Sequence, residues 1–114
     1  MKYSIDVQEL YKTFLLNGQK TIEWRLNKWK FATLQVWDTL FFESWEEFIV
    51  ENISYYQSFR EMIKTLWRKN IIPDAKNDDE AINIYHRFYT SEDENKYWVV
   101  AIQMKRVDEV EGIA

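Results

Sequence analysis

The segment from Gly18 to Leu26 constrains the fold most, because it joins a helix stop to an alternating strand. Asn17-Gly18 ends the helical pattern that precedes it, and the next side chains alternate between the two faces of a strand. One face is polar and the other is apolar. The polar face carries Thr21, Glu23 and Arg25, and the apolar face carries Ile22, Trp24 and Leu26. Lys20 stands at the mouth of the strand, where its ammonium can reach either way.

Two interpretations of the polar face stay open. The first is an edge strand with a solvated ion pair between Glu23 and Arg25, which contributes little to stability. The second is an anion or nucleotide site, in which Lys20 and Arg25 contact phosphate or carbonyl oxygens and Glu23 fixes the guanidinium. The spacing alone does not choose between them.

Patterns along the rest of the chain predict short strands interrupted by helices. Strands are expected over residues 2–5, 20–26, 39–43, 47–54 and 97–106, with a register shift near Asn52. Helices are expected from about Val7, capped by Asp6; from Ser58; and from Asn77 or Asp78 to about Tyr89. Residues 27–36 fit a loop with one helical turn, and 90–95 an acidic turn. This order predicts an α+β fold, a small, partly open β-barrel with helical inserts.

Apolar stripes on these helices predict the core. The helical residues expected to face it are Leu10, Tyr11, Phe14, Leu15, Phe59, Met62, Ile63, Leu66, Ala81, Ile82, Ile84, Tyr85 and Phe88.

Length and composition predict one domain over residues 1–107, with 108–114 as a frayed tail. The chain has no cysteine and one histidine, His86, which argues against disulfides, thiolate catalysis and metal sites. We therefore expect no metal and no cofactor. No apolar run is long enough to span a membrane, and the N-terminus lacks an apolar signal segment. A cytoplasmic protein with no membrane partner, treated as a monomer, is expected.

The net charge of −4 is unevenly distributed. Basic residues gather around the Gly18–Leu26 segment and again between residues 60 and 69, whereas acidic residues gather at 43–51, 78–80 and 92–94. A basic cleft on an acidic body is compatible with a nucleic-acid or nucleotide ligand. Solvated faces without a partner produce the same pattern.

Glycine is scarce and tryptophan abundant in this chain, with 2 glycines and 6 tryptophans. Average usage of about 7% predicts roughly 8 glycines. Trp37 and Trp45 also fall where turns are expected, and turns favour glycine because it adopts positive φ at little cost. We therefore hypothesise that all six tryptophans are glycines in the natural protein, from UGA codons that its host translates as glycine. The alternative is that the tryptophans near the motif are native and stack on bases.

The residues Gly18, Lys20, Glu23 and Arg25 follow a G-x-K-x-x-E-x-R pattern. This pattern resembles that of the ASCH domain (activating signal cointegrator homology), a member of the PUA-like superfamily. The similarity extends over roughly residues 1–107. It includes the strand at 38–42, the helix start Tyr56-Gln57-Ser58-Phe59, the insert at 73–89 and the closing strand at 96–102. In the ASCH pattern, glycine usually stands where this chain has Trp37 and Trp98.

The resemblance implies a PUA-like barrel and, because PUA relatives recognise RNA, a module that binds RNA or a nucleotide in a cleft around the motif. The residues expected to bind the ligand are Lys20, Thr21, Glu23, Arg25, Ser58, Tyr85 and Arg87. Ser58 also fits a plain helix cap, and Tyr85 a core tyrosine with a hydrogen-bonded hydroxyl. Arg87 fits either a solvated or a cleft-facing side chain.

Two other functions stay open. Some bacterial ASCH-like proteins are N4-acetylcytidine amidohydrolases whose motif lysine is catalytic, and that lysine corresponds to Lys20. Glu23 stands where those enzymes have a threonine. Hydrolysis of a modified nucleoside or of RNA would make Lys20 and Glu23 the catalytic residues. The third alternative is a protein-interaction adaptor that uses the acidic surface.

Overall fold

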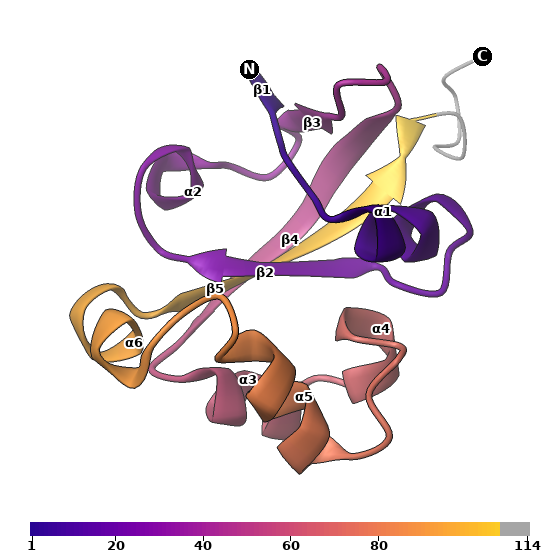
Figure 1. Ribbon diagram of the computed structural model, residues 1–114. Helices are drawn as coiled ribbons and strands as arrows, with labels where there is room; N and C mark the ends of the chain where they lie inside the picture. The colour runs from indigo at the N-terminus through magenta and orange to yellow at the C-terminus, as the bar shows by residue number, and fades with distance from the viewer. Residues whose placement is uncertain (108–114) are drawn as a thin grey trace.

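The computed structural model describes residues 1–107 and contains one five-stranded sheet with the strand order β1-β3-β4-β5-β2 (Figure 1). The strands are β1 (Lys2–Ser4), β2 (Ile22–Leu26), β3 (Thr39–Phe41), β4 (Glu47–Tyr56) and β5 (Val99–Arg106). The helices are α1 (Glu9–Leu16), α2 (Lys30–Thr33), α3 (Phe59–Thr65), α4 (Arg68–Ile71), α5 (Asp78–Tyr85) and α6 (Ser91–Tyr97). The tail predicted over 108–114 lies outside the described residues.

The sheet is mixed and curls into a half-barrel. β1 pairs with β3 in parallel, and the other neighbouring strands pair antiparallel. The long pair β4–β5 carries a bulge between Val50 and Asn52, where the register shifts as the sequence predicts. A bulge bends its strand and increases the local twist. The predicted small, barrel-like α+β fold is therefore confirmed.

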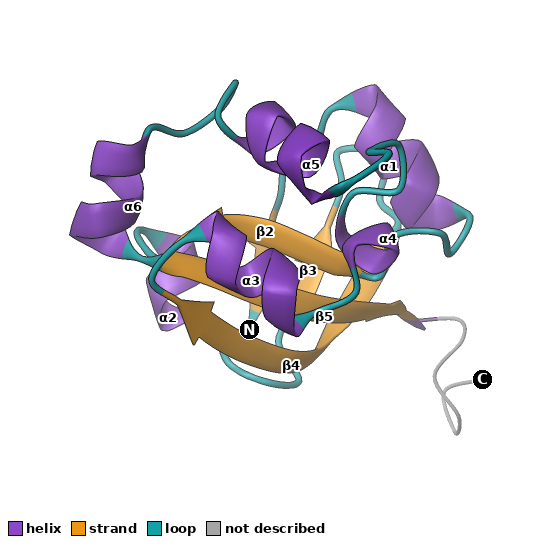
Figure 2. Cartoon of the chain, turned by 90° about the horizontal axis from the view of Figure 1, so that it is seen from below, coloured by secondary structure: helices purple, strands orange, loops and turns teal. Residues whose placement is uncertain are grey.

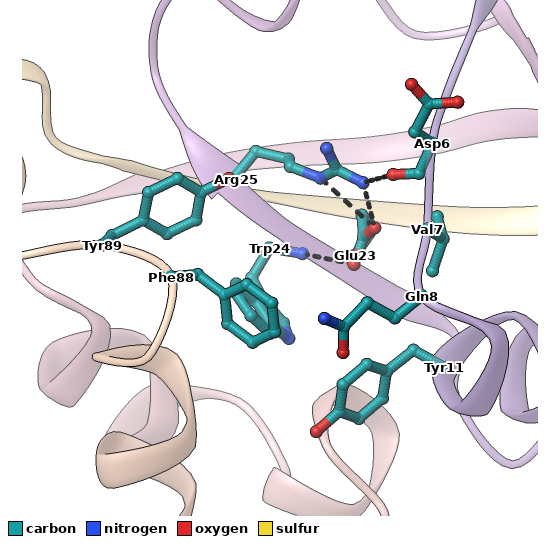
Figure 3. Close-up of a pocket in the computed structure, with 9 residues that line it drawn as sticks. All are labelled: Asp6, Val7, Gln8, Tyr11, Glu23, Trp24, Arg25, Phe88 and Tyr89. Carbon is teal, nitrogen blue, oxygen red and sulfur yellow. Dashed lines mark hydrogen bonds and ion pairs between the residues drawn. The ribbon is translucent and has the colours of Figure 1, made fainter.

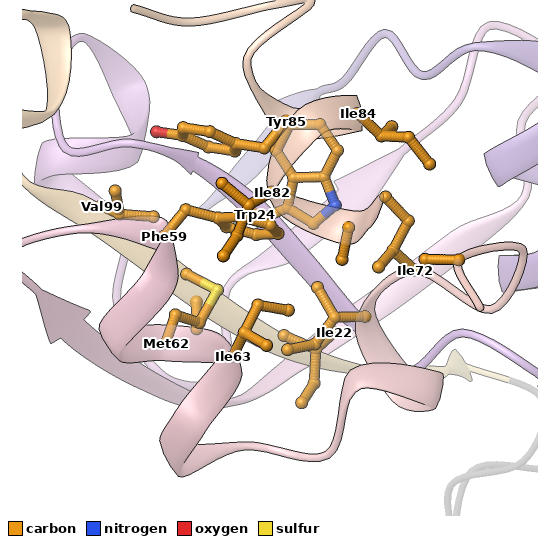
Figure 4. Close-up of a cluster of buried hydrophobic side chains, with 14 of the residues drawn as sticks. Ile22, Trp24, Phe59, Met62, Ile63, Ile72, Ile82, Ile84, Tyr85 and Val99 are labelled. Carbon is orange, nitrogen blue, oxygen red and sulfur yellow. The ribbon is translucent and has the colours of Figure 1, made fainter. Parts of the chain in front are cut away.

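Two apolar cores lie on opposite faces of this sheet. Along β5, Val99 and Ala101 belong to one cluster, whereas Val100, Ile102 and Met104 belong to the other. Successive strand residues point to opposite faces, so β5 is buried on both sides. Helices α3, α4 and α5 lie together over one face (Figure 2), and their side chains form the first cluster with Ile22, Trp24 and Val99 (Figure 4). Among residues 1–107, no helix is long and apolar enough to cross a membrane.

The predicted start of the first helix and one of its predicted core residues are wrong. Asp6 does not cap α1; the cap position is Gln8, whose backbone is still extended (ψ 145°). The Asp6 carbonyl instead accepts a hydrogen bond from Arg25, which holds this segment against β2. Leu10 is 50% exposed and not part of the core. The predicted caps Ser58 and Asn77 are confirmed, because each side chain accepts a hydrogen bond from a first-turn N–H.

The chain between α3 and β5 is more helical than the sequence predicts. The short helix α4 is not predicted, and α6 replaces the expected acidic turn and ends just before β5. A capping box starts α6, since Thr90 and Asp93 exchange side chain-to-backbone hydrogen bonds. Helix α5 ends at Tyr85, so Phe88 lies beyond it and is 39% exposed rather than buried.

Four of the six tryptophans have positive φ. The angles are 54° at Trp29, 77° at Trp37, 73° at Trp45 and 66° at Trp98, and all four side chains are exposed. Glycine adopts this conformation readily, whereas a Cβ atom makes it costly. Gly18, in the helix-stop turn, has φ 83°. These four tryptophans therefore occupy backbone positions for which glycine is the ordinary residue.

Candidate functional site

Glu23 is the centre of a buried ionic cluster on β2. Glu23 is 4% exposed, and each of its two carboxylate oxygens has a charged or hydrogen-bonding partner. Oε1 lies 3.3 Å from the Lys20 ammonium and accepts the Trp24 backbone N–H at 3.1 Å. Oε2 accepts from Arg25 Nη2 at 2.9 Å and from its Nε at 3.3 Å (Figure 3). β2 is an edge strand, as in the first interpretation, but the charges are buried rather than solvated.

Lys20 is fully buried, so the expectation that its ammonium lies at the strand mouth and reaches either way is wrong. Its side chain is 0% exposed, and it donates to the Ile22 carbonyl at 2.6 Å and to the Ile71 carbonyl at 2.5 Å. With Glu23, these acceptors account for all three ammonium hydrogens. The ammonium also lies 5.9 Å from the ring centroid of Tyr11 and 5.7 Å from that of Trp24.

Burial and pairing shift the pKa values of this cluster in opposite directions. Burial disfavours the charged ammonium and lowers the pKa of Lys20 to about 8, with Glu23 opposing the shift. Burial alone would raise the pKa of Glu23, but Lys20 and Arg25 together hold it below its ordinary value. Burial likewise works against the Arg25 charge, and Glu23 nevertheless raises the pKa of Arg25. Lys20 is therefore a buried lysine that can lose its proton near pH 8.

A pocket of about 390 Å³ opens beside this cluster (Figure 3). It lies between the segment that leads into α1, the edge strand β2 and the segment that follows α5. The lining residues are Asp6, Val7, Gln8, Tyr11, Glu23, Trp24, Arg25, Phe88 and Tyr89. Aromatic rings form its walls, and Glu23 with Arg25 forms a polar end. The pocket thus combines stacking surfaces with a paired acceptor and donor.

Arg25 is the charged donor at this pocket. Its side chain is 18% exposed, and its Nη2 donates both to Glu23 and to the Asp6 carbonyl at 2.5 Å. The guanidinium also lies 5.0 Å from the Phe31 ring centroid. Contacts on both sides fix the orientation of the guanidinium before any ligand arrives, which reduces the entropic cost of binding.

The structure brings Glu23 and Arg25 together at the pocket, with Lys20 behind its wall, but separates the other predicted residues from it. Thr21 lines a different depression, with residues at the end of β5. Ser58 caps α3, and Arg87 is exposed beyond α5. Tyr85 is buried and stacks on Phe59 at 4.2 Å; its hydroxyl has no hydrogen-bond partner among the described residues, which contradicts the expected bonded hydroxyl.

Sequence reasoning missed the aromatic walls. Tyr11 and Phe88 are predicted as core, and Gln8 and Tyr89 are not singled out. The aromatic content of 18% and the run from Tyr85 to Tyr89 are the signals that could have indicated them. Among residues 1–107, no group of three or more His, Cys, Asp and Glu side chains could hold a metal ion.

Comparison with known proteins finds similarity to solved structures. No protein-family model matches the chain, and no curated protein matches it. The crystal structure of hypothetical protein PH0355 superposes with a TM-score of 0.89 at 34% identity, over 94% of this chain and 100% of that one. The solution NMR structure of protein PF0455 from Pyrococcus furiosus gives a TM-score of 0.82 at 34% identity, over 95% of this chain and 99% of that one.

Proposed function

This chain belongs to the same family as PH0355 and as PF0455 from Pyrococcus furiosus, and we propose that it is a cytoplasmic ASCH-domain protein with a PUA-like barrel that binds a nucleotide in the pocket at Glu23 and Arg25. The G-x-K-x-x-E-x-R pattern supports the ASCH assignment, and the curled half-barrel supports the PUA-like one. The ligand is either a free nucleotide or a nucleotide within single-stranded RNA. Both carry the same base, which is the group that the pocket would recognise.

The observation that carries the proposal is an aromatic pocket that ends in a buried, paired carboxylate and guanidinium. Aromatic faces stack on bases, at about 1–3 kcal/mol per base. A carboxylate accepts from base amino or imino groups, and a guanidinium donates to base carbonyl or phosphate oxygens. The volume of about 390 Å³ suits a single small ligand.

The buried position of Lys20 changes the role that we propose for it. A side chain that is 0% exposed cannot contact a phosphate unless the pocket rearranges. Lys20 instead pairs with Glu23 and fixes its carboxylate. We therefore assign ligand contact to Glu23 and Arg25, and treat Lys20 as a positioning residue.

Arg25→Ala is expected to weaken nucleotide binding by about 10- to 150-fold, because a charged hydrogen bond contributes roughly 1.5–3 kcal/mol. The fold should persist, since Glu23 keeps its contacts with Lys20 and the Trp24 N–H. Calorimetric titration with AMP and with a short single-stranded RNA, beside thermal melts, measures both effects.

Arg87→Ala is the matched control, because Arg87 is exposed and does not line the pocket. Its affinity should equal that of the parent chain. Repeating the titrations at two salt concentrations separates the ligand sources, since phosphate contacts along an RNA make binding strongly salt-dependent. Equal affinity in the Arg25→Ala chain contradicts the site.

A second candidate function is hydrolysis of a modified nucleoside, in which a rearrangement of the pocket wall brings the buried Lys20 amine, whose pKa is lowered to about 8, into contact with the substrate. If the neutral amine is the base or nucleophile, the rate should rise with pH, because deprotonation produces the active form, and level off above about 8. Release of acetate from N4-acetylcytidine, followed from pH 6 to pH 10, tests this profile. A rate that is flat or that falls through pH 8 would exclude Lys20 as the catalytic group.

A further inference from the structure

Trp24 packs among other aromatic side chains, of which Figure 4 labels Phe59 and Tyr85. Its indole is 6% exposed. Ring centroids lie 5.3 to 6.4 Å away on several sides, and the rings belong to Tyr11, Phe59, Tyr85, Phe88 and Tyr89. The indole Nε1 is buried and has no hydrogen-bond partner within residues 1–107. An unsatisfied buried donor is unfavourable, so the indole N–H destabilises this arrangement.

The backbone angles of the other tryptophans bear on which residue stands here in the natural protein. Trp29, Trp37, Trp45 and Trp98 have positive φ, where glycine is the ordinary residue. The hypothesis of a reassigned codon covers all six tryptophans, and it therefore includes position 24, although the strand backbone there does not itself favour glycine. A glycine there leaves the space of the indole empty.

The vacated space joins the pocket, because Trp24 is one of the residues that line it. Polar groups border this space. Lys20 Nζ lies 5.7 Å from the indole centroid, and Glu23, the preceding residue on β2, lines the same pocket. A ring placed in this space would therefore have aromatic side chains and the Lys20 ammonium beside it.

We propose that the space filled by the Trp24 indole is a ring-binding chamber that is vacant in the natural protein, which has glycine at position 24, and that it receives a purine-sized base. The indole is a fused bicyclic ring of that size, so its fit gives the dimensions of the ligand. The rings of Phe59, Phe88 and Tyr89 supply the walls. The inference rests on the proposed nucleotide-binding function and names the base of its ligand.

The test compares the parent chain of 114 residues with its Trp24→Gly and Trp67→Gly variants. Trp67 is exposed and has an ordinary φ of −74°, so its replacement controls for loss of a tryptophan. Calorimetric titrations use indole, adenosine and guanosine. We expect Trp24→Gly to bind indole and at least one of the nucleosides 10-fold or more tightly than the parent chain does. Trp67→Gly should not differ from the parent chain.

Two other binding outcomes overturn the inference. Indole binding without nucleoside binding shows a cavity that does not take a base, and counts against the proposed function as well. Equal nucleoside binding by the parent and Trp24→Gly chains leaves the proposed function standing but removes the chamber. If Trp24→Gly does not fold, the mass of the tryptic peptide 21–25 from the natural host decides. Tryptophan in that peptide refutes the proposal, whereas glycine supports it.

Discussion

Replacing Trp37 and Trp98 with glycine is expected to raise the free energy of unfolding by about 1–2 kcal/mol at each position. Their φ angles of 77° and 66° force a Cβ atom toward the backbone. Their side chains are 72% and 44% exposed, so little apolar burial is lost on replacement. Denaturant unfolding followed by far-UV circular dichroism measures the change without depending on tryptophan fluorescence.

Controls distinguish relief of backbone strain from removal of an exposed indole. Trp67→Gly has the same chemistry at φ −74°, and it should give no gain because glycine there only adds freedom to the unfolded chain. Trp37→Ala keeps the Cβ atom and should recover little of the gain. If Trp67→Gly and Trp37→Gly shift the midpoint equally, backbone strain is not the cause.

The same replacement at Trp29 and Trp45 should give smaller gains. The Trp45 ring stacks on Phe41 with centroids 5.8 Å apart, and the Lys28 ammonium lies 3.8 Å from the Trp29 ring centroid. Glycine removes these contacts together with the strain. Strain at four positions of about 1–2 kcal/mol each is comparable with the stability of a whole domain, roughly 5–15 kcal/mol. The unusual composition therefore has a direct consequence for folding.

Local patterns predicted most of the sheet. Alternation located β2 and β4, and the change in the apolar pattern near Asn52 predicted the bulge that curls the sheet. The caps at Ser58 and Asn77 follow from side chains that bond to nearby backbone. Each of these features depends on residues within a few positions of one another. Helix α6 was not predicted, because its acidic residues resemble those of a turn, although Thr90 and Asp93 form the capping box that starts it.

The candidate site was only partly predictable because its environment comes from distant segments. The motif placed Glu23 beside Arg25, and their pairing is local. The burial of Lys20 depends on the Ile71 carbonyl, 51 positions away along the chain. Phe88 and Tyr89 reach the pocket only because α5 ends at Tyr85. Neither spacing nor periodicity within β2 contains this information.

Glu23→Gln is expected to lower the free energy of unfolding by about 3–5 kcal/mol, because it leaves the buried Lys20 ammonium without a counter-ion. A buried pair contributes little net stability, but breaking it is costly since the remaining charge stays desolvated. The double variant Lys20→Met, Glu23→Gln removes both charges of this pair. It should recover part of the loss, because Arg25 stays without its carboxylate and the Ile71 carbonyl loses its donor. Denaturant unfolding at pH 6 measures all three chains.

The loss caused by Glu23→Gln should also shrink as the pH is raised toward 8. In the parent chain the carboxylate supports the Lys20 charge, and the ammonium loses its proton near pH 8. Without the carboxylate the folded-state pKa of Lys20 falls further below its ordinary value of 10.5. Lys20 in the folded variant therefore loses its proton at a lower pH than in the folded parent chain. Between these two pKa values, the free energy of unfolding of the variant rises with pH, whereas that of the parent does not yet change. A loss that stays constant up to pH 8 would mean that the variant keeps Lys20 charged, and that solvent reaches the ammonium once Glu23 is removed.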